Sequence, residues 1–146
     1  YLLGMNYYDQ IIDVNRDLTA VNKALVIFKL IIDRYPATDY AKDAYFKIIY
    51  LENSLAAKEL DVAMTYFSLK KYLASTKRFK RIINNFQTTI FVPEALHRLV
   101  EVYLILGVKE EAIVNARVLG YNFPDSKWYK LSYKLLKDNN ILVNKY

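Results

Sequence analysis

The sequence predicts an all-α protein, built as a helical-repeat solenoid with one extended helix. Among its 146 residues there are only three Gly and three Pro. Such scarcity of turn-forming residues favours helices over a turn-rich β fold. Apolar residues make up 54% of the chain, which is enough for a continuous core in one domain. A similar turn-like segment also occurs three times between apolar runs, and this recurrence favours a repeat architecture.

The recurring segments are YPATD (35–39), FQTT (86–89) and FPDS (123–126). In each of them an aromatic residue is followed by Pro or Gln and then by small polar residues. A helix often ends just before a Pro, because Pro disfavours helical geometry in the residue ahead of it. Ser, Thr or Asp then caps the next helix by accepting hydrogen bonds from its first backbone N–H groups. Each segment is therefore predicted to end one helix and begin another.

The elements before the second of these segments include one of unusual length. An opening helix is expected at about 1–13, a polar loop at 13–18 and a second helix at 19–35. The stretch from Tyr40 to about Lys71 contains no Pro or Gly, and its apolar residues keep helical spacing. It is predicted to be one helix, roughly 45 Å long at 1.5 Å per residue. The alternative is two helices with a turn near Asn53 and Ser54.

The remaining helices, at about 73–86, 92–107 and 109–121, repeat with a period of 37 residues. A period of this size with two helices per unit is typical of tetratricopeptide-like solenoids. The pattern positions are filled by Leu99, Tyr103, Ala112 and Pro124 in one unit, by Val62, Tyr66, Ser75 and Phe79 (with Gln87 for Pro) in the unit before it, and by Ala24, Phe28 and Pro36 earlier. Tyr66 and Tyr103 should therefore occupy equivalent buried positions. About 14 extra residues, within the long helix, break the period once.

A closing helix is predicted from about Ser126 to Asp138, as a cover for the last repeat. It carries a series of large apolar residues: Trp128, Tyr129, Leu131, Tyr133, Leu135 and Leu136. The predicted organisation is thus a repeat region with its closing helix at 1–138 and a tail at 139–146. The chain begins at Tyr1 within an apolar run, so we expect a fragment or a processed product. The sequence contains no apolar run long enough for a transmembrane helix.

The net charge of +6 is spread over the helical segments, and its densest patch is KRFKR at 77–81. No nucleic-acid-binding module accompanies this charge, so a nucleic-acid partner is not expected. A basic face for an acidic protein partner or an anionic lipid surface is favoured instead. In the predicted helix the apolar residues point inward, and Arg78 stands off the core beside Lys77 and Arg81. Arg78→Glu is accordingly expected to leave thermal stability nearly unchanged.

The sequence offers no catalytic or cofactor site. There is no Cys, no Gly-rich phosphate loop and no nucleophile elbow. His97 is the single His, and with Glu101 it forms an i, i+4 pair that lacks a third metal ligand. His97 is interpreted as a helix-surface residue. We therefore predict that the chain is not an enzyme and has no metal or cofactor.

Five stretches, in this order, resemble the BamD family (also called ComL) of outer-membrane assembly lipoproteins in its alphaproteobacterial form. They are YYDQIIDVNRD (7–17), RYPATDYAKDA (34–44), LAAKELDVAMTYF (55–67), FQTTIFVPEALHRLVEVYLILG (86–107) and NFPDSKWYKLSYKLL (122–136). The resemblance covers nearly the whole chain and corresponds to the C-terminal half of the family. Its N-terminal repeats and lipid-bearing Cys would lie outside this sequence.

The resemblance implies a non-enzymatic scaffold on the periplasmic face of the outer membrane, lipid-anchored in the full-length protein. It would act in the machinery that inserts β-barrel proteins, with BamA docked through the POTRA domain nearest the membrane. The family has an Arg contact to BamA at the position of Arg78, and Lys77 and Arg81 flank it. Other Bam components and unfolded outer-membrane proteins are further expected partners.

Two other functions stay open from the sequence alone. A periplasmic tetratricopeptide adaptor of the cell-division coordinator type uses similar turns between helices, but lacks the 14-residue break in the period. A basic surface that binds anionic lipid or nucleic acid is the second alternative. Salt dependence separates binding to an anionic ligand from docking to a protein. Nucleic-acid affinity falls steeply with salt, whereas the affinity of a partly apolar protein interface is less sensitive.

Overall fold

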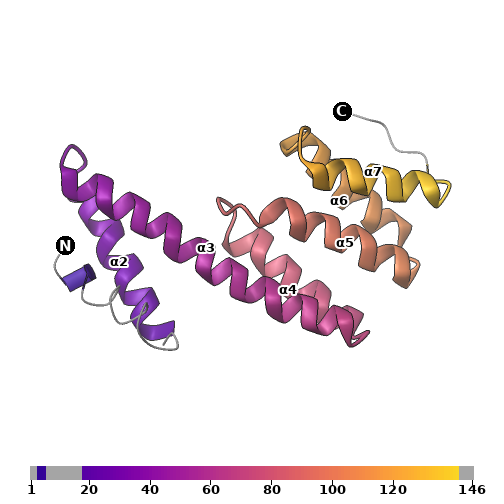
Figure 1. The fold of residues 1–146 in the computed structure, drawn as a ribbon, viewed down its shortest axis with the longest axis horizontal. Coiled ribbons are helices and arrows are strands. Elements are labelled where there is room, and N and C mark those ends of the chain that lie inside the picture. Colours follow the sequence, from indigo (N-terminus) through magenta and orange to yellow (C-terminus); the bar gives the residue numbers. More distant parts are fainter. Residues whose placement is uncertain (1–2, 6–17, 142–146) are drawn as a thin grey trace. The chain divides into compact units, whose positions relative to one another are not determined.

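The computed structural model describes residues 3–5 and 18–141, and every structural statement below concerns these residues. Their main elements are the helices α2 (Leu18–Arg34), α3 (Asp39–Ser68), α4 (Tyr72–Asn85), α5 (Val92–Leu106), α6 (Lys109–Asn122) and α7 (Lys127–Asp138) (Figure 1). The described residues contain no strand, so the all-α prediction is confirmed. The expected opening helix and polar loop, and the end of the tail, fall almost wholly outside the described residues.

Helix α3 is a single helix of 30 residues (Figure 1). It passes through Asn53 and Ser54 without interruption, and the Asn53 amide donates to the carbonyl oxygen of Ile49 one turn earlier, at 2.9 Å. The prediction of one long helix is confirmed and the two-helix alternative is wrong. The helix ends three residues before Lys71, and Lys70 then takes a left-handed backbone conformation with φ of 61°.

Polar side chains cap two of the three predicted helix starts. Thr38 Oγ1 accepts from the Ala41 backbone N–H at 3.2 Å at the start of α3, and Ser126 Oγ accepts from Trp128 at 3.1 Å at the start of α7. The Thr89 hydroxyl donates back to the Phe86 carbonyl at 2.7 Å, as Thr38 does to Tyr35, but Thr89 does not cap α5, whose N-cap residue is Phe91. Its capping role is therefore a wrong prediction, because α5 begins three residues later, at Val92, with a Pro in its first turn.

The chain divides into two compact units, residues 1–54 and residues 55–146. In the first unit the buried residues of α2 from Val21 onward recur every three or four positions, and those of α3 are spaced by three and seven residues, which is one and two helical turns. This spacing places one face of each helix in a core. The buried apolar residues of this unit are Ala20, Val21, Ala24, Phe28, Ile31, Ala41, Ala44 and Leu51.

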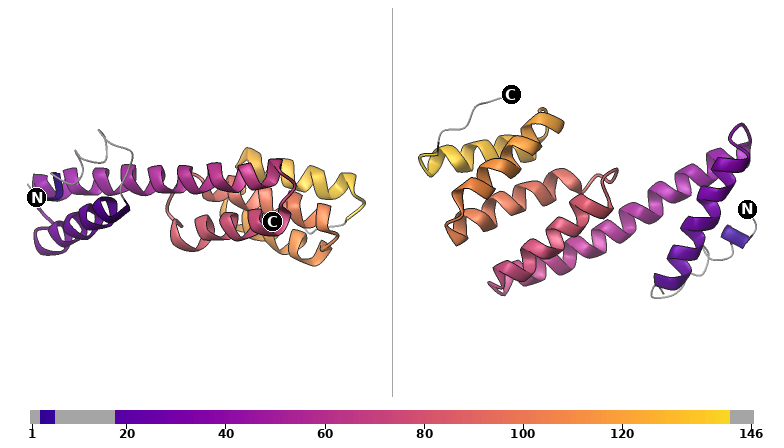
Figure 2. Two further views of the ribbon diagram at one scale, coloured as in Figure 1. Left: turned by 90° about the horizontal axis from the view of Figure 1, so that it is seen from below. Right: turned by 180° about the vertical axis from the view of Figure 1, so that it is seen from behind.

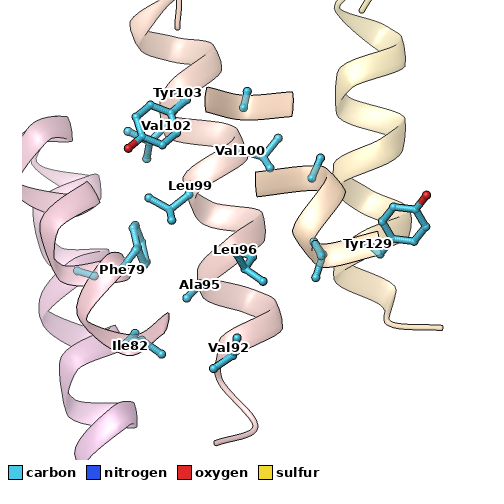
Figure 3. Close-up of a cluster of buried hydrophobic side chains, with 14 of the residues drawn as sticks. Phe79, Ile82, Val92, Ala95, Leu96, Leu99, Val100, Val102, Tyr103 and Tyr129 are labelled. Carbon is cyan, nitrogen blue, oxygen red and sulfur yellow. The ribbon is translucent and has the colours of Figure 1, made fainter. Parts of the chain in front are cut away.

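In the second unit α5 is the central helix. It packs against α4, α6 and α7, and α6 also packs against α7. Figures 1 and 2 show α5 flanked by α4 on one side and by α6 and α7 on the other. One hydrophobic cluster joins these helices to the last turns of α3, and Figure 3 shows part of it. This series of packed helices is the tetratricopeptide-like arrangement that the sequence predicts.

The small repeat positions lie in the core, as the 37-residue period requires. Ser75 and Ala112 are both fully buried, so the helices of each pair can approach closely. The aromatic positions are not equivalent, however: Tyr103 is buried and Tyr66 is only half-buried. The expectation of equal burial is wrong. Tyr103 on α5 lies against α4, where Lys80 Nζ is 5.7 Å from the centre of the Tyr103 ring. Within the second unit, no described helix precedes the segment of α3 that carries Tyr66.

Gly120 permits the close approach of α6 and α7. A Cβ at this position would lie 2.5 Å from Cε1 of Tyr129, whose ring is buried. Ala favours a helix over Gly by about 1 kcal/mol, so Gly120→Ala would stabilise an exposed helix. We expect the opposite here, a loss of about 1–3 kcal/mol in the free energy of unfolding, because the ring cannot move without opening the helix contact. Urea unfolding would measure the change, and a stabilised variant would contradict this packing.

Candidate docking surface

The basic surface predicted from the sequence lies on α4. Phe79 and Ile82 are fully buried, and this fixes which side of α4 faces the core. Lys77 and Arg81 are exposed, and Arg78 is partly exposed, with 31% of its side chain accessible. Since residues three and four apart share a helix face, the three cations form one surface, named here the α4 basic face.

A carboxylate from α3 lies against two of these cations. Arg78 Nη1 donates to Glu59 Oε1 at 3.1 Å, and Arg81 Nη1 lies 3.6 Å from the same oxygen. The Glu59 side chain is only 18% exposed, so the pair is partly shielded from solvent. Lys77 forms no ion pair with any described residue. The arrangement brings together Arg78, Arg81 and Glu59, and leaves Lys77 beside them.

Glu59 holds the Arg78 side chain but uses only part of its hydrogen-bonding capacity. A guanidinium has five N–H donors, and the contact with Glu59 uses one of them. The other donors can bind a partner carboxylate with two parallel hydrogen bonds. Because the side chain is already held, less rotamer freedom is lost when a partner binds. The α4 basic face therefore has the chemistry of a site for an acidic protein surface.

This geometry changes one expectation from the sequence. Arg78 does stand off the buried core, but it also joins α4 to α3 through Glu59. Its replacement by Glu would remove that ion pair and place two carboxylates side by side. The change should therefore lower stability measurably, by about 1 kcal/mol, which is near the upper end for a surface pair.

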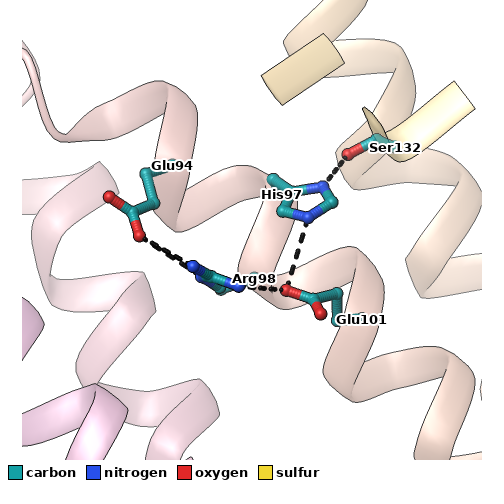
Figure 4. Close-up of polar contacts among 5 residues, drawn as sticks. All are labelled: Glu94, His97, Arg98, Glu101 and Ser132. Carbon is teal, nitrogen blue, oxygen red and sulfur yellow. Dashed lines mark hydrogen bonds and ion pairs between the residues drawn. The ribbon is translucent and has the colours of Figure 1, made fainter. Parts of the chain in front are cut away.

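A second polar cluster joins α5 to α7 (Figure 4). His97 Nδ1 lies 2.7 Å from the hydroxyl oxygen of Ser132, and His97 Nε2 lies 3.3 Å from Glu101 Oε1. His97 is only 6% exposed and Ser132 is fully buried. The interpretation of His97 as a surface residue is thus wrong, because α7 packs over this side of α5.

The partners of His97 determine its tautomer. A carboxylate only accepts hydrogen bonds, so the contact with Glu101 requires the proton on Nε2. Nδ1 then accepts a hydrogen bond from the Ser132 hydroxyl. Arg98 draws on the same carboxylate, with its Nη1 2.8 Å from Glu101 Oε1, and also donates to Glu94 (Figure 4). The cluster is a satisfied polar contact between two helices.

Burial lowers the pKa of His97 below its ordinary value, although the nearby Glu101 carboxylate acts in the opposite direction. The Arg98 cation, which is paired with the same carboxylate, lowers the pKa of His97 further. A lowered folded-state pKa means that the unfolded chain binds the proton first as the pH falls. The contribution of His97 to stability is therefore complete above the unfolded pKa of about 6.5 and decreases below it.

The direction of this pKa shift can be measured directly, because His97 is the single His of the chain. We expect the imidazole signal in a proton NMR titration to show a pKa below 6.5 in the folded protein. A folded-state pKa at or above 6.5 in the unsubstituted protein would contradict the buried neutral imidazole.

The described residues contain no group of three or more side chains that could hold a metal ion. None of the described helices combines the length and the hydropathy that a membrane crossing requires.

Comparison with known proteins identifies the family. Residues 1–119 match the family described as YfiO, outer membrane lipoprotein. The chain belongs to this family. The resemblance that the sequence shows to BamD is confirmed by two relatives named outer membrane protein assembly factor BamD. The Caulobacter vibrioides protein is 47% identical over 141 residues, and the Rickettsia prowazekii protein is 41% identical over 138 residues.

The YfiO-family chain spans about half the length of these relatives. The matches cover 97% and 94% of this chain, but 46% of the Caulobacter protein and 55% of the Rickettsia protein. A BamD from Neisseria meningitidis is 35% identical over 112 residues, which are 77% of this chain and 42% of that protein. The family and its tetratricopeptide-like helical fold are thus shown for the larger part of the chain.

Sequence reasoning found the cations of the α4 basic face but missed their carboxylate. Glu59 lies 19 residues before Arg78, on another helix, and no local spacing links the two. It likewise missed the contact between His97 and Ser132, which are 35 residues apart. The one available signal was Ser132 itself, a small polar residue among the apolar positions of the closing helix.

Proposed function

We propose that this chain is a non-enzymatic scaffold of the β-barrel assembly machinery, and that it docks BamA through the POTRA domain nearest the membrane. The family match and the name of the relatives, outer membrane protein assembly factor, support the general role. The α4 basic face supports the docking step. We also propose that the chain works on the periplasmic face of the outer membrane, held there by a lipid anchor outside these residues.

The observation that carries this proposal is the Arg78 guanidinium of α4 held by Glu59 on the C-terminal half of α3. A scaffold needs a recognition group whose position does not depend on a flexible loop. Arg78 meets this need, because the buried Phe79 fixes the rotation of α4. Arg is also enriched at the energetic centres of protein interfaces. The proposal assigns no catalytic group or cofactor to the chain.

Titration calorimetry of this chain with the isolated membrane-proximal POTRA domain tests the function. We expect saturable one-to-one binding that weakens only moderately when salt is raised, since a protein interface is partly apolar. Absence of saturable binding would refute the docking function. A steep loss of affinity with salt, together with equal binding to an unrelated polyanion, would instead favour a general anionic ligand.

A further inference from the structure

Helix α7 carries a second basic surface that differs from the α4 basic face. Four of its twelve residues are lysines, and all four are exposed: Lys127, Lys130, Lys134 and Lys137. They follow one another at intervals of three, four and three residues. At 3.6 residues per turn these intervals confine them to an arc of about 80° around the helix, over a length of about 15 Å. We call this surface the α7 lysine stripe.

The opposite side of α7 is fixed in the core. Tyr129, Ser132 and Leu136 are buried and spaced at three and four residues. The packing of α7 therefore directs the stripe to solvent, whichever rotamers the lysine side chains adopt. Leu131 is 46% exposed, and Asp138, at the end of the helix, is the one acidic residue of α7.

The two basic surfaces differ in how their cations are held. On α4 the partly buried Glu59 carboxylate positions the Arg78 guanidinium. A guanidinium held in this way suits one partner carboxylate in a defined geometry. The stripe contains only ammonium groups on flexible stems, and none forms an ion pair with a described residue. Lys127 has an aromatic contact, with its Nζ 4.8 Å from the centre of the Trp128 ring. A row of ammonium groups on flexible side chains suits a fluid surface with many charges, such as a membrane, better than a single partner group in a fixed position.

We propose that the α7 lysine stripe binds an anionic phospholipid surface and so orients the scaffold against the membrane. This inference rests on the proposed function, which places the chain at the outer membrane. Each lysine near an anionic membrane raises the binding constant about fivefold. Because the apolar face of α7 is used in the core, the binding is electrostatic, with little insertion into the acyl region.

Co-sedimentation with vesicles tests the stripe. The 146-residue chain is mixed with vesicles of phosphatidylcholine alone, or of phosphatidylcholine with phosphatidylglycerol. We expect binding only to the second kind. It should be lost when salt rises from about 0.1 M to about 1 M, which shortens the Debye length from about 10 Å to about 3 Å. The triple variant Lys130→Gln, Lys134→Gln and Lys137→Gln should bind about a hundredfold more weakly, because three such contributions multiply.

Two further variants serve as matched controls. Lys58→Gln, Lys70→Gln and Lys109→Gln together remove the same charge from other exposed positions and should bind nearly as the unsubstituted chain does. Replacement of the same three stripe lysines by Arg keeps the charge and should also keep the binding. Equal losses in both Gln variants, or no loss in either, would overturn the proposal, since net charge or another surface would then be responsible.

The same variants are titrated with the POTRA domain. Unchanged POTRA affinity in the stripe variant, with lost vesicle binding, is the expected result. A stripe variant that loses POTRA affinity and keeps vesicle binding would show that the stripe contacts an acidic protein, which overturns the lipid proposal. If the unsubstituted chain binds vesicles but not the POTRA domain, the proposed docking function is refuted, and the proposal that the stripe binds lipid is retained.

Discussion

Arg78→Glu is expected to weaken binding of the YfiO-family chain to the BamA POTRA domain by about 2–5 kcal/mol. Two causes combine in this estimate. The substitution removes a guanidinium that can bind a carboxylate with two hydrogen bonds, and it places a negative charge against the partner's own. In the free protein the introduced carboxylate would also face Glu59, which accepts a hydrogen bond from Arg78 at 3.1 Å in the unsubstituted chain. Titration calorimetry would measure the affinity.

Glu59→Gln is the matched control for this change. It removes the Arg78–Glu59 ion pair, together with the longer contact of Arg81 with the same carboxylate, but leaves the Arg78 cation in place. Both variants should therefore lose a similar, small amount of stability, about 1 kcal/mol or less. Only Arg78→Glu should lose most of the POTRA affinity. Lys77→Glu, which reverses a charge on the exposed neighbour, should have an intermediate effect.

Two results would contradict the role of Arg78. One is an affinity of Arg78→Glu equal to that of the unsubstituted chain. The other is an equal loss of affinity in Glu59→Gln and Arg78→Glu, since the ion pair would then act only by holding α3 and α4 together. Circular dichroism of each variant confirms that the compared proteins are folded.

Phe79→Ala is expected to lower the free energy of unfolding by about 3–5 kcal/mol. The Phe79 side chain is fully buried in the cluster that joins α3, α4 and α5. Figure 3 shows it directed from α4 toward α5, on the side of Leu99. Removal of the ring leaves a cavity that the surrounding helices fill only in part, and the lost contacts and the cavity both contribute. Urea unfolding followed by circular dichroism would measure the loss.

Leu73→Ala provides the comparison on the same helix. Leu73 is 70% exposed, and its truncation should change the free energy of unfolding by no more than about 0.5 kcal/mol. A small effect of Phe79→Ala, close to that of Leu73→Ala, would show that α4 does not contribute its apolar face to the core. The burial of Phe79 would then not be what orients α4 and directs Arg78 outward.

The helices were predictable because their boundaries are encoded locally. Thr38 and Ser126 cap the helices that follow them, and Gly107 ends α5 in a left-handed conformation with φ of 78°. The long α3 was predictable from the uninterrupted helical spacing of its apolar residues. Each of these signals involves residues a few positions apart, where spacing along the chain determines spacing in the fold.

The environments of His97 and Glu59 were not predictable in the same way. Helix α5 is buried on several sides, by α4, α6 and α7, so a polar residue on it can be covered even where the pattern suggests an exposed face. That covering depends on α7, whose Ser132 lies 35 residues away. Contacts between distant helices depend on tertiary packing, and single-residue patterns carry little information about it.

Site-specific photocrosslinking tests the docking role of the α4 basic face most directly. A photoreactive residue replaces Lys77 in one variant and Val114 in another; both positions are exposed, the first on α4 and the second on α6. Each variant is irradiated with the BamA POTRA domain. We expect a covalent product from position 77 and none from position 114, with the product at 77 lost when Arg78→Glu is added. A product from position 114 and none from position 77 would contradict docking through α4.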